Sequence, residues 1–251
     1  MKRIEIIFKE NNELKPNYNM GSIFHGALME ILPDKACDIF HKDGVKAFSQ
    51  FVMAESLNES ITNFKWVINT LNEEAAEYIL KPFISGNIRG LNLLHKGETL
   101  EISDIIEHEE MSFDNLVRQF FLSNEAKRDV NINFITPCSF KSNNKYIFFP
   151  DIGLIYKNII NRFDSCSTDI KLNDESTVNH LVENTNIVSY KLNSCFFHLE
   201  GVKIPAFKGN IKFRINGPQT LVNLANLIFA FSKWSGIGIK TSLGMGGVTV
   251  E

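Results

Sequence analysis

The order of strand and helix patterns along the chain constrains its fold more than any other feature of the sequence. In Arg3–Phe8, the apolar residues Ile4, Ile6 and Phe8 alternate with Arg3, Glu5 and Ile7, which predicts a strand. Apolar residues recur at helical spacing over Met20–Leu32, Pro33 ends that pattern, and Asp34 offers an N-cap for a second, short helix. Further strands are predicted at Phe48–Met53, Asn63–Thr70, Asn87–Leu94 and Glu101–Ile106, with a helix at Glu73–Phe83.

A second cycle of strands and helices follows the first. Helices are predicted at Phe113–Leu122, Ile152–Phe163, Glu175–Asn184 and Leu221–Trp234, and strands at Asn131–Ile135, Lys145–Phe149, Ile187–Leu192, Cys195–Leu199, Asn210–Ile215 and Gly247–Val250. We therefore expect an α+β fold of two tandem ferredoxin-like (βαββαβ, RRM-like) domains. A junction near residues 123–130 divides the chain into an N-terminal domain of residues 1–125 and a C-terminal domain of residues 126–251.

The composition excludes several other classes of protein. With 21 phenylalanines and a net charge of only −3, the chain can bury enough apolar surface to fold, so intrinsic disorder is excluded. No apolar run reaches the roughly 18 residues of a membrane span, and charged residues interrupt the first segment, so neither an anchor nor a signal peptide is expected. The four cysteines stand far apart without a CxxC pair, which argues against a zinc site and favours free thiols in a cytoplasmic protein: Cys37, Cys138, Cys166 and Cys195.

The charge is distributed unevenly along the chain. Residues 98–114 carry seven acidic side chains and no lysine or arginine, whereas residues 191–251 carry seven basic side chains and two acidic ones. The last quarter therefore has an excess of five positive charges, which a polyanion could sense on one face of the molecule. The alternative is an ordinary solvated strand surface.

The most unusual segment is glycine-rich and lies near the C-terminus. Five of the fifteen glycines fall between Ser235 and Val248, around the sequence Lys240-Thr241-Ser242. Such a loop can direct backbone N–H groups, a positive charge and hydroxyl donors at a phosphate. It is not a nucleotide P-loop, because Ile239 stands where that motif needs glycine. The alternative is a tight connection between the last helix and the last strand.

Several segments together resemble a known family. "SGIGIKTSLGMGGV" is similar to the glycine-rich signature of the CRISPR-associated endoribonucleases that cut repeat RNA into guide RNAs, within the repeat-associated mysterious protein superfamily. "MGSIFHGALMEIL" and "DKACDIFHKDGVKAFS" resemble the family's first helical region, "NFITPCSFK" the start of its second domain, and "FKGNIKFRING" the strand before its last helix. The resemblance is closest to members that serve type III or type I effector systems.

The resemblance implies an activity and a set of partners. Members have tandem ferredoxin-like domains and cleave without a metal or another cofactor: the 2′-hydroxyl attacks the adjacent phosphate and leaves 2′,3′-cyclic phosphate and 5′-hydroxyl ends. The expected partners are CRISPR repeat RNA and a multi-subunit CRISPR effector complex, and a homodimer is compatible with the family. No association with a membrane is expected.

The resemblance also implies candidate catalytic residues. His41 matches the catalytic histidine of the family, and Lys46 matches the position of a lysine that stabilises the transition state. Phe24 stands where many members have a tyrosine, so His25 beside it is expected to supply the second proton-transfer group. If His25 is structural instead, catalysis depends on His41 and Lys46 alone. His95 and the three later histidines are expected to be structural.

The expected RNA-binding residues come from the glycine-rich segment and the strand before the last helix. They are Gly236, Gly238, Lys240, Thr241, Ser242, Gly244, Gly246, Lys208, Lys212 and Arg214. The sequence is also compatible with two other functions. One is a non-catalytic RNA-binding subunit of an effector complex, and the other is a small-molecule enzyme or ligand-binding protein on a ferredoxin-like scaffold.

Overall fold

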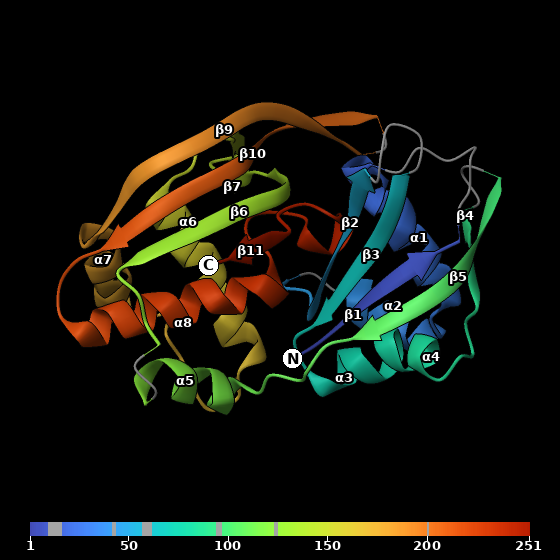
Figure 1. The fold of residues 1–251 in the computed structure, drawn as a ribbon, viewed down its shortest axis with the longest axis horizontal. Helices are drawn as coiled ribbons and strands as arrows, with labels where there is room; N and C mark the ends of the chain where they lie inside the picture. Colours follow the sequence, from blue (N-terminus) through green and yellow to red (C-terminus); the bar gives the residue numbers. More distant parts are fainter. Residues whose placement is uncertain (10–16, 42–43, 57–61, 94–96, 123–124, 200) are drawn as a thin grey trace.

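The described residues form two main antiparallel sheets, each with helices packed on one face, which lie side by side, and a small two-stranded hairpin (Figure 1). The computed structural model describes residues 1–9, 17–41, 44–56, 62–93, 97–122, 125–199 and 201–251, with the backbone alone for residues 41, 54–56, 62 and 63. The expected α+β fold of two tandem ferredoxin-like domains is confirmed.

The N-terminal domain has the βαββαβ order with one added strand. Its elements are β1 (Lys2–Phe8), a 3-10 turn (Tyr18–Met20), α1 (Gly21–Ile31), α2 (Asp34–His41), β2 (Phe48–Ser56), β3 (Thr62–Thr70), α3 (Glu73–Ala75), a π turn (Ala76–Leu80), α4 (Lys81–Ile84), β4 (Gly90–Leu93) and β5 (Glu98–Glu107). The sheet order is β2-β3-β1-β5-β4, so β1, β2, β3 and β5 make the ferredoxin-like sheet and β4 extends its edge.

The alternation seen in the first residues places one face of β1 in the core. Ile4, Ile6 and Phe8 are buried, and Ile6 pairs with the fully buried Trp66 of β3. The rings of Phe8 and Phe64 stack at 5.1 Å, and α1 covers this face through Phe24, whose ring lies 5.0 Å from that of Trp66. The first strand and the first helix thus form one apolar core because their periods match their elements.

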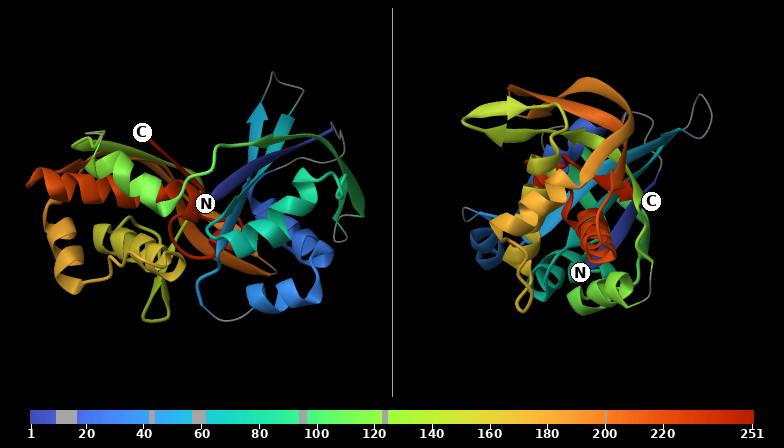
Figure 2. Two further views of the ribbon diagram at one scale, coloured as in Figure 1. Left: turned by 90° about the horizontal axis from the view of Figure 1, so that it is seen from below. Right: turned by 90° about the vertical axis from the view of Figure 1, so that its left-hand side faces the viewer.

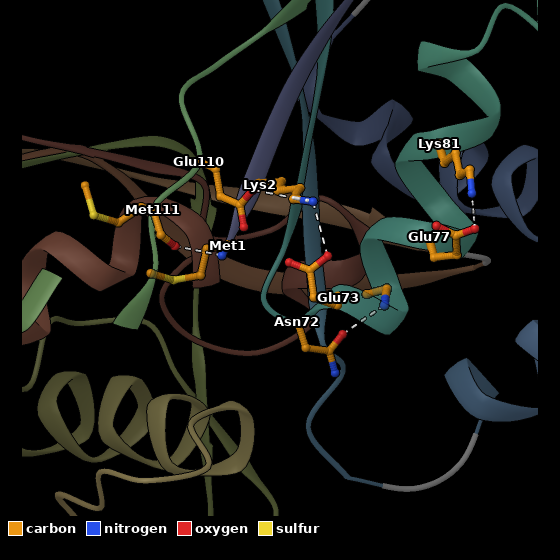
Figure 3. A network of polar contacts seen from close by, with 9 residues as sticks. Met1, Lys2, Asn72, Glu73, Glu77, Lys81, Glu110 and Met111 are labelled. Atoms are coloured by element: carbon orange, nitrogen blue, oxygen red, sulfur yellow. Dashed lines mark hydrogen bonds and ion pairs between the residues drawn. The ribbon is translucent and has the colours of Figure 1, made fainter. Parts of the chain in front are cut away.

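The helix expected at Glu73–Phe83 is interrupted. Asn72 caps its start, since its side-chain Oδ1 accepts a 2.9 Å hydrogen bond from the amide of Ala75 (Figure 3). A π turn then separates α3 from α4, and Pro82 stands in the first turn of α4, where its missing N–H has no cost. The spacing of apolar residues predicts the buried face that α3, the π turn and α4 share. It does not predict where the helix changes from α to π geometry.

The C-terminal domain repeats the βαββαβ order. Its elements are α5 (Phe113–Phe121), β6 (Asp129–Cys138), β7 (Phe140–Ser142), β8 (Lys145–Ile147), α6 (Ile152–Cys166), α7 (Glu175–Glu183), β9 (Thr185–Leu199), β10 (Val202–Ile215), α8 (Gln219–Ser235), a 3-10 turn (Thr241–Leu243) and β11 (Val248–Val250). The sheet order is β11-β6-β10-β9, and β7 and β8 form a separate hairpin.

Two expected strands are one. The segments expected at Ile187–Leu192 and Cys195–Leu199 belong to the continuous strand β9, which pairs with β10 from Thr185↔Ile215 to Val202↔Leu199. The polar residues Asn193 and Ser194 are paired within this ladder. Their polarity predicts a break, but backbone pairing with a long neighbouring strand keeps them extended.

Helix α5 packs with the second domain although it precedes the expected boundary between residues 125 and 126. Leu116 and Phe120 of α5 lie in the C-terminal core, and the Phe113 ring lies 5.0 Å from that of Phe163 on α6. The two sheets fall on either side of the expected junction, and α5 adds to the core of the second.

Polar contacts join the two domains along the last turn of α8. The Arg3 guanidinium donates hydrogen bonds to Asn69 Oδ1 at 2.6 Å and to the Lys233 carbonyl, and burial lowers its pKa. Ser49 Oγ donates to the Trp234 carbonyl at 2.6 Å. The chain's amino group donates to the Met111 carbonyl at 2.7 Å (Figure 3). Strands of the first domain thereby satisfy carbonyls at the C-terminal end of a helix of the second.

All four cysteines are free thiols, as expected. Among the described helices, none is long and apolar enough to cross a membrane. No group of three or more histidine, cysteine, aspartate or glutamate side chains within the described ranges is arranged to hold a metal ion.

A buried charge in α6 leads to a prediction about stability. Arg162 is 8% exposed, its Nε and Nη2 have no hydrogen-bond partner within the described residues, and burial lowers its pKa to about 10. The Arg162→Met variant is expected to raise the free energy of unfolding by about 1–4 kcal/mol, because it removes a desolvated, unpaired cation. The penalty is complete below the folded-state pKa, so urea unfolding at about pH 6 and pH 9 should give the same gain. A less stable variant would contradict this.

Candidate active site and nucleic-acid interface

The candidate catalytic histidine His41 is the last residue of α2. Pro33 separates α2 from α1, and the Ala36 amide donates to the Pro33 carbonyl at 2.8 Å, which makes the tight start of α2. The His41 side chain lies outside the described part of the chain, as do residues 42 and 43. Its backbone places the histidine at the open end of α2, next to Phe40.

A row of three rings joins His25 to this end of α2. His25 lies one turn into α1, and its imidazole stacks on the buried ring of Phe48 with centroids 5.9 Å apart and an angle of 3°. Phe48 in turn meets Phe40 edge-on at 5.3 Å. Since Phe40 precedes His41, the two candidate histidines are on elements that pack against one phenylalanine.

Lys46 and Phe40 line the same pocket. A pocket of about 170 Å³ is lined by Ile39, Phe40, Val45, Lys46, Ala47, Asn72 and Glu74. The half-buried Lys46 precedes β2, and the amide of Leu71 donates to the Ala47 carbonyl at 2.8 Å, which ties this segment to the end of β3. The structure thus gathers His25, the end of α2 and Lys46 around Phe40 and Phe48.

The glycine-rich loop packs against the first turn of α1. A Cβ atom on Gly21, the first residue of α1, would lie 2.5 Å from the Leu243 carbonyl oxygen and 2.6 Å from the Gly244 Cα. Only glycine at both positions allows this approach of two backbones from different domains. The loop therefore abuts the helix that carries His25.

Gln50 of β2 fastens the same contact. Its Nε2 donates to the carbonyls of Gly21 at 2.7 Å and Ser242 at 3.0 Å, and its Oε1 accepts from Trp66 Nε1 at 2.8 Å. Gln50 is fully buried, so these bonds satisfy polar groups that water does not reach. Gln50 was not among the residues predicted from the sequence, although an amide in the mostly apolar strand Phe48–Met53 was a usable signal.

Other glycines of the loop serve its internal packing. The amide of Gly238 donates to Asn158 Oδ1 at 2.8 Å, and the amide of Gly246 donates to the Pro137 carbonyl at 2.9 Å. The amide of Gly236 completes the end of α8 through the Ser232 carbonyl. These N–H groups are engaged within the protein and do not point at a phosphate. The expected structural alternative, a tight connection, therefore describes most of the loop.

The part of the loop that faces outward is short. Lys240 is exposed in the left-handed conformation, with φ 55°, and Ser242 is half-buried, whereas Thr241 is 2% exposed. Lys208 lies near this part, because its ammonium sits 5.1 Å from the centre of the Tyr18 ring and Tyr18 packs in one apolar cluster with Ile239. Lys208 and the loop are thus both linked to Tyr18, which lies in the 3-10 turn before α1.

Lys212 and Arg214 are not brought to the loop. They lie towards the other end of β10, where Asp129 bonds Arg214 Nε at 2.7 Å and lies 3.0 Å from the Lys212 ammonium. Both cations hold the pKa of Asp129 well below its usual range. The positive excess of the last quarter is therefore partly neutralised by an acidic residue from β6.

The fold and the loop can be compared with those of solved structures. Two ferredoxin-like domains are clasped by a glycine-rich loop after the last helix, which is the tandem ferredoxin-like fold expected from the sequence. A solved structure described as a Cas6 product complex has the same fold, with a TM-score of 0.78 over 100% of this chain and 98% of that chain at 17% sequence identity.

Sequence comparisons find similarity to one family of proteins. Residues 132–248 match the family model of the CRISPR-associated endoribonuclease Cas6. A CRISPR-associated endoribonuclease Cas6 from Streptococcus thermophilus is 29% identical over 100% of this chain and 98% of its own length. One from Mycobacterium tuberculosis is 27% identical over 92% of this chain and 72% of its own length. The chain is similar to the Cas6 endoribonucleases over its whole length, and the resemblance drawn from the sequence is confirmed.

Proposed function

We propose that this protein is an endoribonuclease that cuts CRISPR precursor RNA within its repeats to produce guide RNAs. The relation to Cas6 endoribonucleases along the whole chain supports the activity. The observation that carries the choice of site is the convergence of His25, the end of α2 and Lys46 on the Phe40–Phe48 pair. A non-catalytic RNA-binding subunit does not require such a convergence.

The proposed reaction is an internal transfer at phosphorus that needs no metal ion. One histidine takes the proton from the 2′-hydroxyl as its oxygen bonds to the adjacent phosphorus. The other histidine protonates the 5′-oxygen as its bond to phosphorus breaks, which leaves a 2′,3′-cyclic phosphate and a 5′-hydroxyl. The Lys46 ammonium stabilises the negative charge that develops on the phosphorane oxygens. Imidazole suits both proton transfers because its ordinary pKa, about 6.5, lies near neutral pH.

The proposed RNA path begins where the loop meets α1. Lys240 and Ser242 lie on the exposed part of the loop, and Lys208 lies beside the turn that leads into α1. A phosphate held there is next to the helix that carries His25. Lys212 and Arg214 belong to a second basic position that Asp129 partly neutralises.

A cleavage assay with cognate repeat RNA tests the proposal. Cleavage in EDTA with 2′,3′-cyclic phosphate and 5′-hydroxyl ends is the expected result. Complete loss of activity in EDTA, or a product with a 3′-hydroxyl end, would contradict the mechanism. RNA that is bound and never cut would favour the role of a binding subunit.

The Lys240→Asn variant is expected to bind repeat RNA roughly 5- to 10-fold more weakly. Asparagine tolerates the left-handed backbone of this position, so the substitution removes the charge without straining the loop. The slope of log affinity against log salt concentration should fall by about 0.7–0.9, the value of one lost phosphate contact. Filter binding at several salt concentrations measures both quantities.

Lys212→Asn is the matched control. Its ammonium already pairs with Asp129 at 3.0 Å, so its removal should change the salt slope much less. Equal changes of the salt slope in the two variants would show that Lys240 contributes no more to RNA binding than Lys212 of the sheet does. An effect of Lys240→Asn on the cleavage step alone would remove Lys240 from the binding role.

We further propose that the protein works in the cytoplasm, in keeping with its four free thiols. The multi-subunit effector complex and the homodimer stay predictions.

A further inference from the structure

Two neighbouring phenylalanines are exposed just after the β7–β8 hairpin. Phe148 is 46% exposed and Phe149 is 67% exposed, between the end of β8 and the capping residue Asp151 of α6. Most phenylalanines of this chain lie in the two cores. A pair of large aromatic side chains left in water is the kind of feature that marks a binding surface.

The hairpin that leads to this pair is bonded to the glycine-rich loop. The Ser139 carbonyl accepts a 2.9 Å hydrogen bond from the Ile239 amide, next to Lys240. Ser139 Oγ donates to the Ile147 carbonyl at 3.3 Å, next to Phe148. Ser139 therefore connects the residue before Phe148 to the residue before Lys240. The aromatic pair is held within a few residues' length of the exposed lysine of the loop.

The hairpin has a two-residue turn and carries two exposed lysines. Asn143 and Asn144 form its two-residue turn with φ 48° and 60°, and Tyr146 packs in the apolar cluster that includes Ile239. Lys141 and Lys145 are exposed, and in the part of the chain described here neither enters an ion pair.

The hairpin lies on the same side of the molecule as α2, and the first acidic residue after Phe149 is engaged as a helix cap. The nearby carboxylate of Asp151 accepts the Leu154 amide as the cap of α6. In both views of Figure 2 the hairpin and α2 project from the same side of the molecule. Exposed rings beside unpaired lysines suit a polyanion with flat bases better than an apolar protein surface.

We propose that Phe148 and Phe149 form a stacking platform for an unpaired base of the RNA, beside the phosphates that Lys240 contacts. This inference rests on the proposed function and names how the same site holds single-stranded nucleotides. The rings supply stacking, which tolerates any base, and Lys141 and Lys145 attract the backbone on either side. We therefore expect the protein to accept any base at this nucleotide, provided that the base is unpaired and not stacked on its neighbours.

Binding of repeat RNA by Phe149 variants tests the platform. The bound RNA is held uncut by the His41→Ala substitution and carries 2-aminopurine at one position at a time. At one or two positions the fluorescence should be quenched in the complex, and Phe149→Ala and Phe149→Leu should both remove that quenching. Both variants should bind about 5- to 100-fold more weakly with an unchanged salt slope, while Phe149→Trp should bind as the parent does.

Leu122→Ala is the control, because Leu122 is a 77% exposed apolar residue that follows α5. It should change neither affinity nor quenching. Parent-like affinity and quenching in Phe149→Ala and Phe149→Leu would overturn the platform. Parent-like binding by Phe149→Leu alone would replace stacking with simple apolar contact, which also overturns it. Failure of the unsubstituted protein to bind and cut repeat RNA would instead overturn the proposed function.

Discussion

Replacing His41 with alanine is expected to slow cleavage of repeat RNA by about 10²–10⁴-fold, the usual contribution of a general acid or base. Affinity for the RNA should stay within about threefold, because the proposed phosphate contacts, Lys240 of the loop and Lys208 over the Tyr18 ring, lie on other elements and are unchanged. Single-turnover kinetics with saturating protein measures the chemical step, and filter binding measures affinity. An unchanged rate would remove His41 from the mechanism.

His180→Ala is the matched control for that experiment. His180 is exposed on α7, in the domain that does not carry the candidate catalytic histidines, and its loss should leave the rate unchanged. His25→Ala separates the two interpretations of His25. If it is the second proton carrier, the variant should lose one limb of the bell-shaped pH–rate profile. If His25 only packs on Phe48, stability should fall while the profile keeps its shape.

Gly246→Ala is expected to lower the free energy of unfolding by about 2–5 kcal/mol. The residue has φ +66°, and a Cβ atom there would lie 1.9 Å from the Ile237 carbonyl oxygen. That oxygen belongs to a backbone segment held in place by the bond from the Ile237 amide to the Gly246 carbonyl, at 2.9 Å. The expected loss combines about 1–2 kcal/mol for the left-handed conformation with about 1–3 kcal/mol for overpacking.

Gly86→Ala isolates the clash from the backbone strain. Gly86 has φ +73°, and its added Cβ atom would meet nothing within 4 Å. The Gly86→Ala variant should therefore lose about 1–2 kcal/mol of unfolding free energy, the contribution of the left-handed conformation alone. Urea unfolding of both variants measures the difference. Equal losses would mean that the loop relaxes around the new methyl group, and the close approach would then not explain the glycine.

The order of elements was predictable because each pattern is local. Alternation in Arg3–Phe8 and helical spacing in Met20–Leu32 depend on neighbours along the chain, and both appear as β1 and α1. The exact bounds and geometry of the elements were less predictable from the sequence. The π turn before α4 and the continuity of β9 depend on the partner that each segment packs against or pairs with.

The candidate site divides in the same way. The sequence by itself determined the two ferredoxin-like cycles, the family resemblance and the residues His25, His41 and Lys46 as candidates. Only the tertiary structure decided that most glycines of the loop serve packing, that Gln50 clasps the loop to α1, and that Asp129 engages Lys212 and Arg214. The physical reason is that a close approach or an ion pair depends on which distant backbone or charge arrives opposite a residue, and no local pattern records that arrival.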